Sequence, residues 1–209
     1  MISFAITVSD ELEELKALTS LLFTHIDLKT NEIVILCDST KSTIELNEYL
    51  NSISNICSIN YDKFNSDFAV FKNKINALCS QDYIFQLDAD ELPNVHLLHN
   101  VTTIIIDNKD IELFWIPREN FVEGIKDDHL KKWNMNIDHL NRINFPDYQG
   151  RIYKNKPEIY WHRKVHEFII GAKKQMRMPP RKEWSLMHKK HINKQIISND
   201  YYFKLENNL

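Results

Sequence analysis

The first half of the 209-residue sequence alternates short apolar runs with segments whose apolar residues recur at helical spacing. The apolar runs are rich in β-branched residues and predict strands at 2–8, 33–37, 56–59, 83–87 and 112–116. The periodic segments between the first four runs predict helices. Strands that alternate with helices in this way form a mostly parallel sheet with helices on both faces. The sequence therefore predicts a single α/β domain over residues 1–209.

The regular alternation stops after the fifth predicted strand. Residues 118–148 are polar and aromatic with few periodic signals, which predicts a long loop region that contains one helix. Beyond it we expect a hairpin, an exposed basic loop and a last helix, at 151–161, 173–182 and 198–205. Long irregular segments inside compact domains often carry function, so the second half is expected to contribute to a site.

Composition restricts the classes of partner. Hydrophobic residues make up 43% of the chain and charged residues 26%, as in an ordinary globular protein. The formal net charge of −3 argues against duplex DNA as a partner of the whole protein. Basic residues gather between Lys173 and Lys194, which predicts a solvated surface or, alternatively, a surface for an anionic substrate.

Cysteine spacing and hydropathy point to a reduced protein without a membrane span. Cys37, Cys57 and Cys79 lack the spacing of a zinc site or a disulfide framework, and each lies in an apolar run, so we expect them in the core. No apolar run is long enough to cross a bilayer. We expect a cytoplasmic protein, at most peripheral to the inner face of a membrane.

Acidic residues, Asp38 and Asp88, close two of the predicted strands. In open α/β sheets the ligand crevice lies outside the carboxyl ends of the strands. The chain has only three glycines, none of them near these ends, which excludes the usual phosphate-binding loops. A diphosphate bound here would need a metal ion such as Mn²⁺ or Mg²⁺, which Asp90 and Asp88 can bind. The alternative is a helix N-cap with acidic turn residues.

A longer block surrounds this aspartate pair. Phe64 and the segment through Lys72 and Asn73 lead into the run 82–91, which contains Asp88, Ala89 and Asp90. This block resembles the central part of family-2 glycosyltransferases of GT-A fold, in the version found in bacterial lipopolysaccharide-core and related glycan-building enzymes. The similarity continues in residues 115–120, 145–153 and 159–167, and so covers most of residues 2–170.

The resemblance implies a Rossmann-like half that binds a nucleotide-sugar, residues 1–117, and an acceptor-side half with a C-terminal tail, residues 118–209. It implies a nucleotide-sugar donor, with a UDP-sugar favoured, and a glycan or glycolipid acceptor. The donor site implied consists of Thr7, Val8, Ser9, Glu11, Asp38, Lys72, Asn73, Asp88, Ala89, Asp90, Arg118, Arg151 and His166. Thr7 to Glu11 and Asp38 would meet the nucleotide base, although Ser9 and Asp10 depart from the family pattern.

The chemistry of sugar transfer assigns roles to several of these residues. An inverting transferase needs a general base for the acceptor hydroxyl, and Glu167 is our candidate, with Asp147 as the fallback. The alternative for Glu167 is a surface ion pair with Arg163 or Lys164. His188 stands where many GT-A enzymes supply a further metal ligand, and its alternative is a surface histidine. The guanidinium groups of Arg118 and Arg151 suit phosphate oxygens, or else form structural ion pairs.

Two other functions remain open. One is a binding module of GT-A type that has lost turnover, against which the intact aspartate pair and the Val165-His166-Glu167 segment count. The other is a nucleic-acid-binding protein that uses the basic segment 173–194, against which the net charge and the lack of a nucleic-acid motif count.

Overall fold

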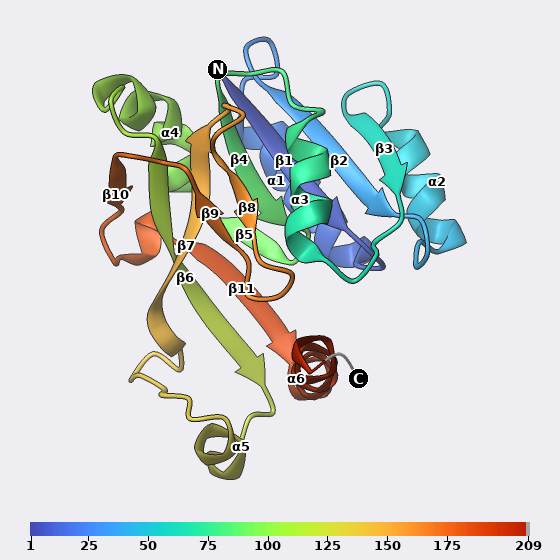
Figure 1. The fold of residues 1–209 in the computed structure, drawn as a ribbon, viewed down its shortest axis with the longest axis vertical. Helices are drawn as coiled ribbons and strands as arrows, with labels where there is room; N and C mark the ends of the chain where they lie inside the picture. Colours follow the sequence, from blue (N-terminus) through green and yellow to red (C-terminus); the bar gives the residue numbers. More distant parts are fainter. Residues whose placement is uncertain (208–209) are drawn as a thin grey trace.

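A nine-stranded mixed sheet organises the chain in the computed structural model, which describes residues 1–207 (Figure 1). Its first part consists of β3 (Ser58–Asp62), β2 (Glu32–Asp38), β1 (Ile2–Val8) and β4 (Tyr83–Asp88), in this spatial order and all parallel. Helices α1 (Leu12–His25), α2 (Ile44–Ser52) and α3 (Phe68–Asn76) connect these strands. The alternating α/β pattern of the first half is confirmed.

Helix starts in this half follow from capping side chains. Thr43 precedes α2 and its hydroxyl accepts the backbone N–H of Leu46 at 3.2 Å. Asp67 precedes α3 and its carboxylate accepts the N–H of Val70 at 2.9 Å. Such side chains satisfy amide groups that the first helical turn leaves without partners.

The sheet is covered on both faces. Phe4 and Ile6 of β1 point to the face that packs against Leu15 and Leu18 of α1 and against α4 (Val95–Asp107), a helix that the sequence pattern did not single out. Ala5 points to the opposite face, where α3 and the two-stranded sheet of β8 (Tyr160–His162) and β9 (Phe168–Ile170) lie (Figure 1). Burial on both sides explains why these strands read as continuous apolar runs. The three cysteines are buried and free, as expected.

The second half extends the sheet and differs most from the sequence expectation. The order continues from β4 with β7 (Ile143–Lys154), β6 (Leu113–Glu123), β11 (Leu186–His191) and β5 (Glu91–Pro93), and β10 (Gln175–Arg177) pairs with β6. The two ends of the predicted loop, 118–123 and 143–148, are therefore strand, and the one helix expected within it is α5 (Asp127–Lys132). The pattern was missed because β6 and β7 carry polar residues where they pair, as at Arg118 opposite Asp147.

Two smaller expectations were also wrong. The predicted hairpin over 151–161 does not form, because residues 151–153 belong to β7, which pairs with β4 and β6, while β8 pairs with β9. The basic stretch 173–182 contains β10 rather than loop alone. The last helix, α6 (Ile192–Glu206), is longer than predicted. Within residues 1–207, no helix combines the length and the apolar character needed to span a membrane.

Candidate functional site

Asp88 lies at the carboxyl end of β4, beside the end of β1. The parallel register places Thr7 opposite Asp88, and the Thr7 hydroxyl donates to the Asp88 carboxylate at 2.9 Å. The backbone N–H of Ala89 donates to the carbonyl of Thr7 at 3.0 Å, which continues the pairing past the strand end. Two adjacent parallel strands thus fix the Asp88 carboxylate at the edge of the sheet where ligands of such folds bind.

Two cations approach the Asp88 carboxylate from different elements. Lys72 Nζ of α3 lies 3.1 Å from Asp88 Oδ1, and Arg151 Nη2 of β7 lies 2.8 Å from Asp88 Oδ2. Burial alone would raise the pKa of Asp88, but the charges of Lys72 and Arg151 outweigh it and hold this pKa below its usual range. Asp88 is therefore an anion at neutral pH.

Glu91 connects this cluster to a second arginine. Its side chain is fully buried, and its Oε1 accepts from Arg151 at 2.6 Å and from Arg118 at 2.9 Å. Its other oxygen accepts the backbone N–H of Asp88 at 3.2 Å. Arg118 also bonds Asp147 at 2.7 Å. Both arginines thus pair with carboxylates, as in the structural ion-pair alternative, although Arg151 does so through Nη2 and its buried Nε has no partner among residues 1–207.

Glu167 belongs to the same cluster through Lys72. Its carboxylate lies 2.8 Å from Lys72 Nζ, and its side chain is 16% exposed. This partner differs from Arg163 and Lys164, the neighbours considered as its surface partners. Lys72 therefore bridges the carboxylates of Glu167 and Asp88, which are 79 positions apart in the chain.

The fallback carboxylate, Asp147, lies in a separate part of the network. It accepts from Arg118, from Asn120 at 2.9 Å and from Gln149 at 2.8 Å. Burial opposes its ionisation, yet the charge of Arg118 lowers the pKa of Asp147. Asp147 thus accepts hydrogen bonds from three side chains, whereas Glu167 contacts one ammonium group. This difference favours Glu167 over Asp147 as a proton acceptor.

Asp90 and His188 form the next cluster. His188 Nε2 lies 3.3 Å from Asp90 Oδ2, and its Nδ1 lies 2.8 Å from Asn120 Oδ1, so β6 orients the imidazole. Lys190 and Lys194 also approach Asp90, at 3.9 and 3.7 Å. Burial would raise the pKa of Asp90, but His188 and Lys190 lower it.

The expected base-binding residues gather near the ends of β1 and β2. Asp38 is buried, and its Oδ1 accepts from Thr40 and from the backbone N–H of Phe64 at 3.2 Å. Ser9 Oγ lies 3.5 Å from the other Asp38 oxygen. The Glu11 carboxylate accepts the backbone N–H of Ser9 at 2.9 Å and pairs with Lys194 at 3.5 Å. Val8 is buried beside them.

Two of the expected donor-site residues, Asn73 and His166, lie outside these clusters. Asn73 exchanges two hydrogen bonds with the backbone of Trp161, so it joins α3 to β8. Trp161 is buried below Lys72, 4.6 Å from the ring centroid to Nζ, and cannot present a flat face to a sugar. His166 is exposed and pairs with Glu206 of α6 at 3.2 Å.

Sequence reasoning missed several members of the site. Glu91 was noted only as a turn residue, and Lys190 and Lys194 only as part of a basic surface. The ring of Tyr202, on α6, lies 5.7 Å from that of Phe68, and burial together with Asp88, Glu167 and Asp90 raises the pKa of Tyr202 to about 12. His188 and Lys190 are two positions apart, so both lie on one face of a strand. This spacing could have indicated from the sequence that Lys190 lies near His188.

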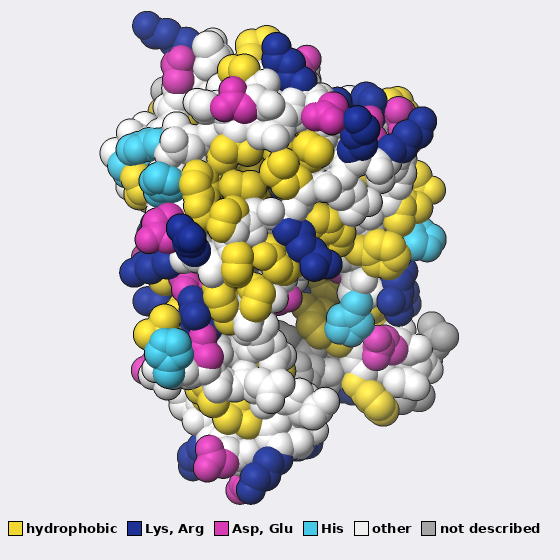
Figure 2. Space-filling model, turned by 90° about the vertical axis from the view of Figure 1, so that its left-hand side faces the viewer, with side chains coloured by type: hydrophobic (Ala, Val, Ile, Leu, Met, Phe, Trp, Pro, Cys, Tyr) yellow, Lys and Arg dark blue, Asp and Glu magenta, His cyan; other side chains and the backbone are white. Residues whose placement is uncertain are grey.

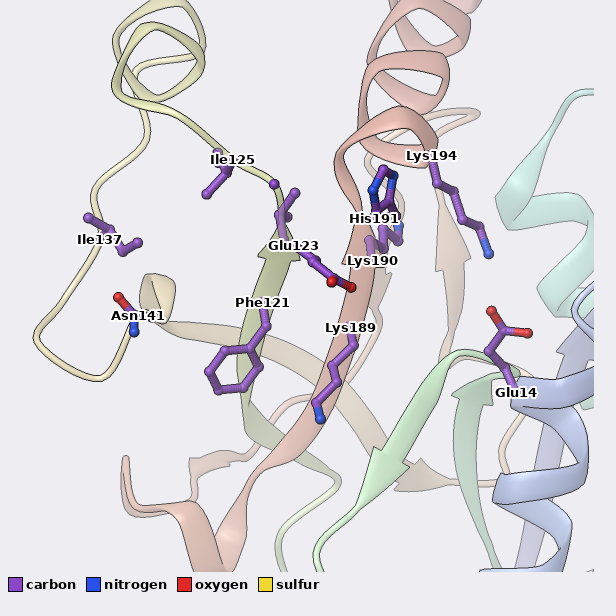
Figure 3. Close-up of a pocket in the computed structure, with 12 residues that line it drawn as sticks. Glu14, Phe121, Glu123, Ile125, Ile137, Asn141, Lys189, Lys190, His191 and Lys194 are labelled. Atoms are coloured by element: carbon purple, nitrogen blue, oxygen red, sulfur yellow. The ribbon is translucent and has the colours of Figure 1, made fainter.

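A pocket of about 620 Å³ opens beside Asp90's lysine partners (Figure 3). On one side lie Phe121 and Ile125 of β6 and the turn after it, with Ile137. On the other side lie the lysines of β11 and α6. Figure 2 shows the surface hollowed between the lobe that carries α5 and the region of α6. The pocket therefore borders the lysine partners of Asp90, whereas Asp88, Asp90 and Glu167 are not among the residues that line it.

The donors around Asp90 match a divalent cation in type. A carboxylate oxygen and an imidazole nitrogen are ligands that manganese accepts. Asp88, the third expected ligand, is engaged by Lys72, Arg151 and Thr7. Among residues 1–207 no three His, Cys, Asp or Glu side chains cluster as a ready metal site. A cation here would take Asp90 and His188 from the protein and its other ligands from phosphate oxygens or water.

Solved structures of TarS support the fold. No protein-family model matches the sequence, and no curated protein matches it significantly. S. aureus TarS superposes with a TM-score of 0.61 at 13% identity over 90% of this chain, and TarS 1-349 in complex with UDP-GlcNAc with 0.61 at 13% identity over 91%. A mannosyltransferase from Pyrobaculum calidifontis, in complex with GDP-Man and Mn²⁺, gives 0.48 at 12% identity over 73% of this chain.

The chain spans only part of these proteins, namely 36% of TarS, 59% of TarS 1-349 and 44% of the mannosyltransferase. The match to TarS nevertheless includes nine-tenths of this chain, and so includes both the parallel first half and the strands that follow it. The central sheet is large and mostly parallel in the region of the candidate site, with helices on both faces. The chain has the GT-A fold of nucleotide-sugar glycosyltransferases.

Proposed function

We propose that this protein is a glycosyltransferase that moves a sugar from a nucleoside diphosphate donor to a hydroxyl group of a glycan or glycolipid. The observation that carries the proposal is the bridge from Asp88 through Lys72 to Glu167 at the carboxyl end of β4. Through this bridge, Asp88 of the expected donor site and the partly exposed carboxylate of Glu167 contact the same ammonium group. The fold and the binding of UDP-GlcNAc by TarS 1-349 support the class of donor.

In this proposal residues 1–117 hold the nucleotide-sugar and residues 118–209 face the acceptor. Asp38, Ser9 and Glu11 lie where the base would bind, and a UDP-sugar is the favoured donor. Asp88, at the carboxyl end of β4 beside the end of β1, would reach the ribose of the nucleotide or the water shell of the cation. Arg118 and Arg151 contribute by positioning Asp88, Glu91 and Asp147 rather than by touching phosphate.

Glu167 is the proposed general base of an inverting reaction. The acceptor oxygen attacks the anomeric carbon, its proton passes to the Glu167 carboxylate, and the bond to the diphosphate breaks. Lys72 fixes the Glu167 carboxylate in place at 2.8 Å. A divalent cation held by Asp90 and His188 would stabilise the charge that develops on the departing diphosphate.

Nucleotide binding and sugar transfer test the proposal together. The purified chain is screened by thermal shift against UDP, GDP, ADP and CDP with and without manganese, and the nucleotide that stabilises it selects the donors for an assay of nucleotide release. We expect stabilisation by one nucleoside diphosphate, and release that depends on an added glycan acceptor. Asp90→Ala should abolish the manganese-dependent part of both signals. Indifference to every nucleotide would refute the proposal, and binding without any release would indicate an inactive binding module.

A further inference from the structure

Lys190 and Lys194 approach one carboxylate from two separate elements. Lys190 belongs to β11 and Lys194 to the first turn of α6, and their amines lie 3.9 and 3.7 Å from Asp90 Oδ2. Lys194 also lies 3.5 Å from Glu11. Carboxylates therefore lie on two sides of the Lys194 amine.

Neither amine makes a hydrogen bond within the part of the chain that the structure describes. Distances of 3.7 to 3.9 Å to Asp90 give attraction between charges but exceed hydrogen-bond length. The Lys190 side chain is 16% exposed and the Lys194 side chain 39% exposed. An ammonium group carries three N–H donors, and those of both lysines remain available to an acceptor that enters the site. The arrangement suits an anion that is added to the site.

The other cations near Asp88 are already occupied. Arg151 bonds Asp88 and Glu91, Arg118 bonds Glu91 and Asp147, and Lys72 bonds Asp88 and Glu167. No glycine lies near the ends of β1, β2 or β4, so a backbone cradle for phosphate is also missing. The amines of Lys190 and Lys194 make no hydrogen bond among residues 1–207, whereas the Arg151 donor that lacks a partner, Nε, is buried.

Both lysines also line the pocket of about 620 Å³ (Figure 3). Figure 3 shows Lys190 and Lys194 on the side of β11 and α6, with Lys194 on the flank nearest Glu14 of α1. A ligand that enters the pocket therefore lies next to both lysines, whereas Asp90 is not among the residues that line it. This access separates them from the buried guanidinium group of Arg151.

We propose that Lys190 and Lys194 bind the diphosphate of the donor directly, so that the nucleotide binds even without a divalent cation. The inference rests on the proposed function, because it assigns the phosphate contacts of that same site. A cation at Asp90 and His188 would act on the same diphosphate, and its contribution would add to that of the lysines. The expected ligand groups are the phosphate oxygens, since ammonium groups bind phosphate as point charges.

The test is calorimetric binding of UDP, or of the nucleoside diphosphate that the thermal screen selects, in EDTA and in manganese. The variants are Lys190→Met and Lys194→Met, which keep the length of the side chain and remove its charge. Lys204→Met is the matched control, because Lys204 is an exposed lysine of the same helix as Lys194, does not line the pocket and makes no ion pair among residues 1–207. Circular dichroism and thermal midpoints check that each variant folds.

We expect the unaltered protein to bind the diphosphate in EDTA. Lys190→Met and Lys194→Met should each weaken that binding at least about tenfold, Lys204→Met should weaken it less than about twofold, and Lys190→Arg should restore most of it. Affinity for the nucleoside monophosphate should fall less, because it carries one phosphate fewer.

Three results would overturn the inference. The first is binding that is detectable only with manganese, which leaves the proposed function intact. The second is diphosphate affinity that stays within twofold in both variants, including the case in which only the KM for the acceptor rises. The third is a lack of binding to any nucleoside diphosphate under either condition, which removes the proposed function as well.

Discussion

The ammonium nitrogen of Lys72 lies 2.8 Å from the carboxylate of Glu167, a residue 95 positions further along the chain. The Lys72 side chain is 5% exposed and also contacts Asp88, so one ammonium group compensates two carboxylates. Removal of one partner of a buried ion pair leaves the others without compensation. The stability of the fold and the geometry of the site therefore depend on the same side chain.

Lys72→Met should lower the free energy of unfolding by about 2 kcal/mol and abolish most transfer activity, because Asp88 and Glu167 lose their shared cation. Lys74→Met is the matched control on the same helix. Lys74 pairs with Asp62 at the surface, with side chains 34% and 42% exposed, and should cost less than about 1 kcal/mol. Urea unfolding measures both, and equal losses in the two variants would contradict the distinction.

Glu167→Gln tests the proposed base. Loss of a general base typically lowers kcat by about 10²-fold to 10⁴-fold, whereas donor binding does not require the proton transfer. We expect kcat to fall in this range while the affinity for the nucleoside diphosphate changes less than about threefold. Asp147→Asn provides the comparison, because Asp147 is held by Arg118 and should affect stability more than kcat. A larger kcat loss in Asp147→Asn would exchange the two roles.

Stability should fall in acid because of Asp88. Its pKa is lowered in the folded state, so its contribution is complete above the unfolded value, about 3.9, and is lost as the pH falls toward the lower folded value. Asp88→Asn removes this titration. The free energy of unfolding of the variant should then fall less steeply below pH 4, by up to about 1.4 kcal/mol per pH unit. Urea unfolding at several pH values measures this dependence. If the free energy of unfolding falls equally steeply with pH in the variant and in the unaltered protein, Asp88 does not titrate in this way.

Gly171 is required by backbone geometry. Its φ angle is +89°, and a Cβ atom placed there would lie 1.6 Å from the carbonyl oxygen of Glu158, so the backbone would have to move. Gly171→Ala should destabilise the protein by about 3 kcal/mol and disturb the β8–β9 pair. Gly150→Ala is the control, because its nearest contact would be 3.3 Å to a Leu113 methyl group. Thermal unfolding of both variants measures the difference.

The first half of the fold was predictable because its strands are buried on both faces. Each of β1, β2 and β4 is a short run of apolar residues, and the helices between them show clear periodicity. The second half was not, because β6 and β7 place Arg118, Asn120 and Asp147 toward the site. Polar side chains that pair with one another remove the alternation by which strands are recognised.

The same reasoning applies to the candidate site. Asp88 and Asp90 could be found from their place at a strand end, and His188 from the resemblance. The partners of each carboxylate could not, because Lys72, Arg151 and Glu91 meet only after three separate segments have folded. Sequence spacing carries no information on such long-range pairs. From the sequence alone Glu91 can be interpreted only as a turn residue, because its partners Arg118 and Arg151 are distant in the chain.

Strand β11 lies between β6 and β5, although it follows both of them in the chain by more than 60 positions. During synthesis, β5 and β6 leave the ribosome well before the strand that joins them, so both have unpaired edges until residues 186–191 emerge. Exposed edges can pair with other chains. His188 and Lys190 arrive with this late strand, so Asp90 gains its partners in the same step that closes the sheet. A nascent chain that lacks β11 would hence be both inactive and prone to aggregate.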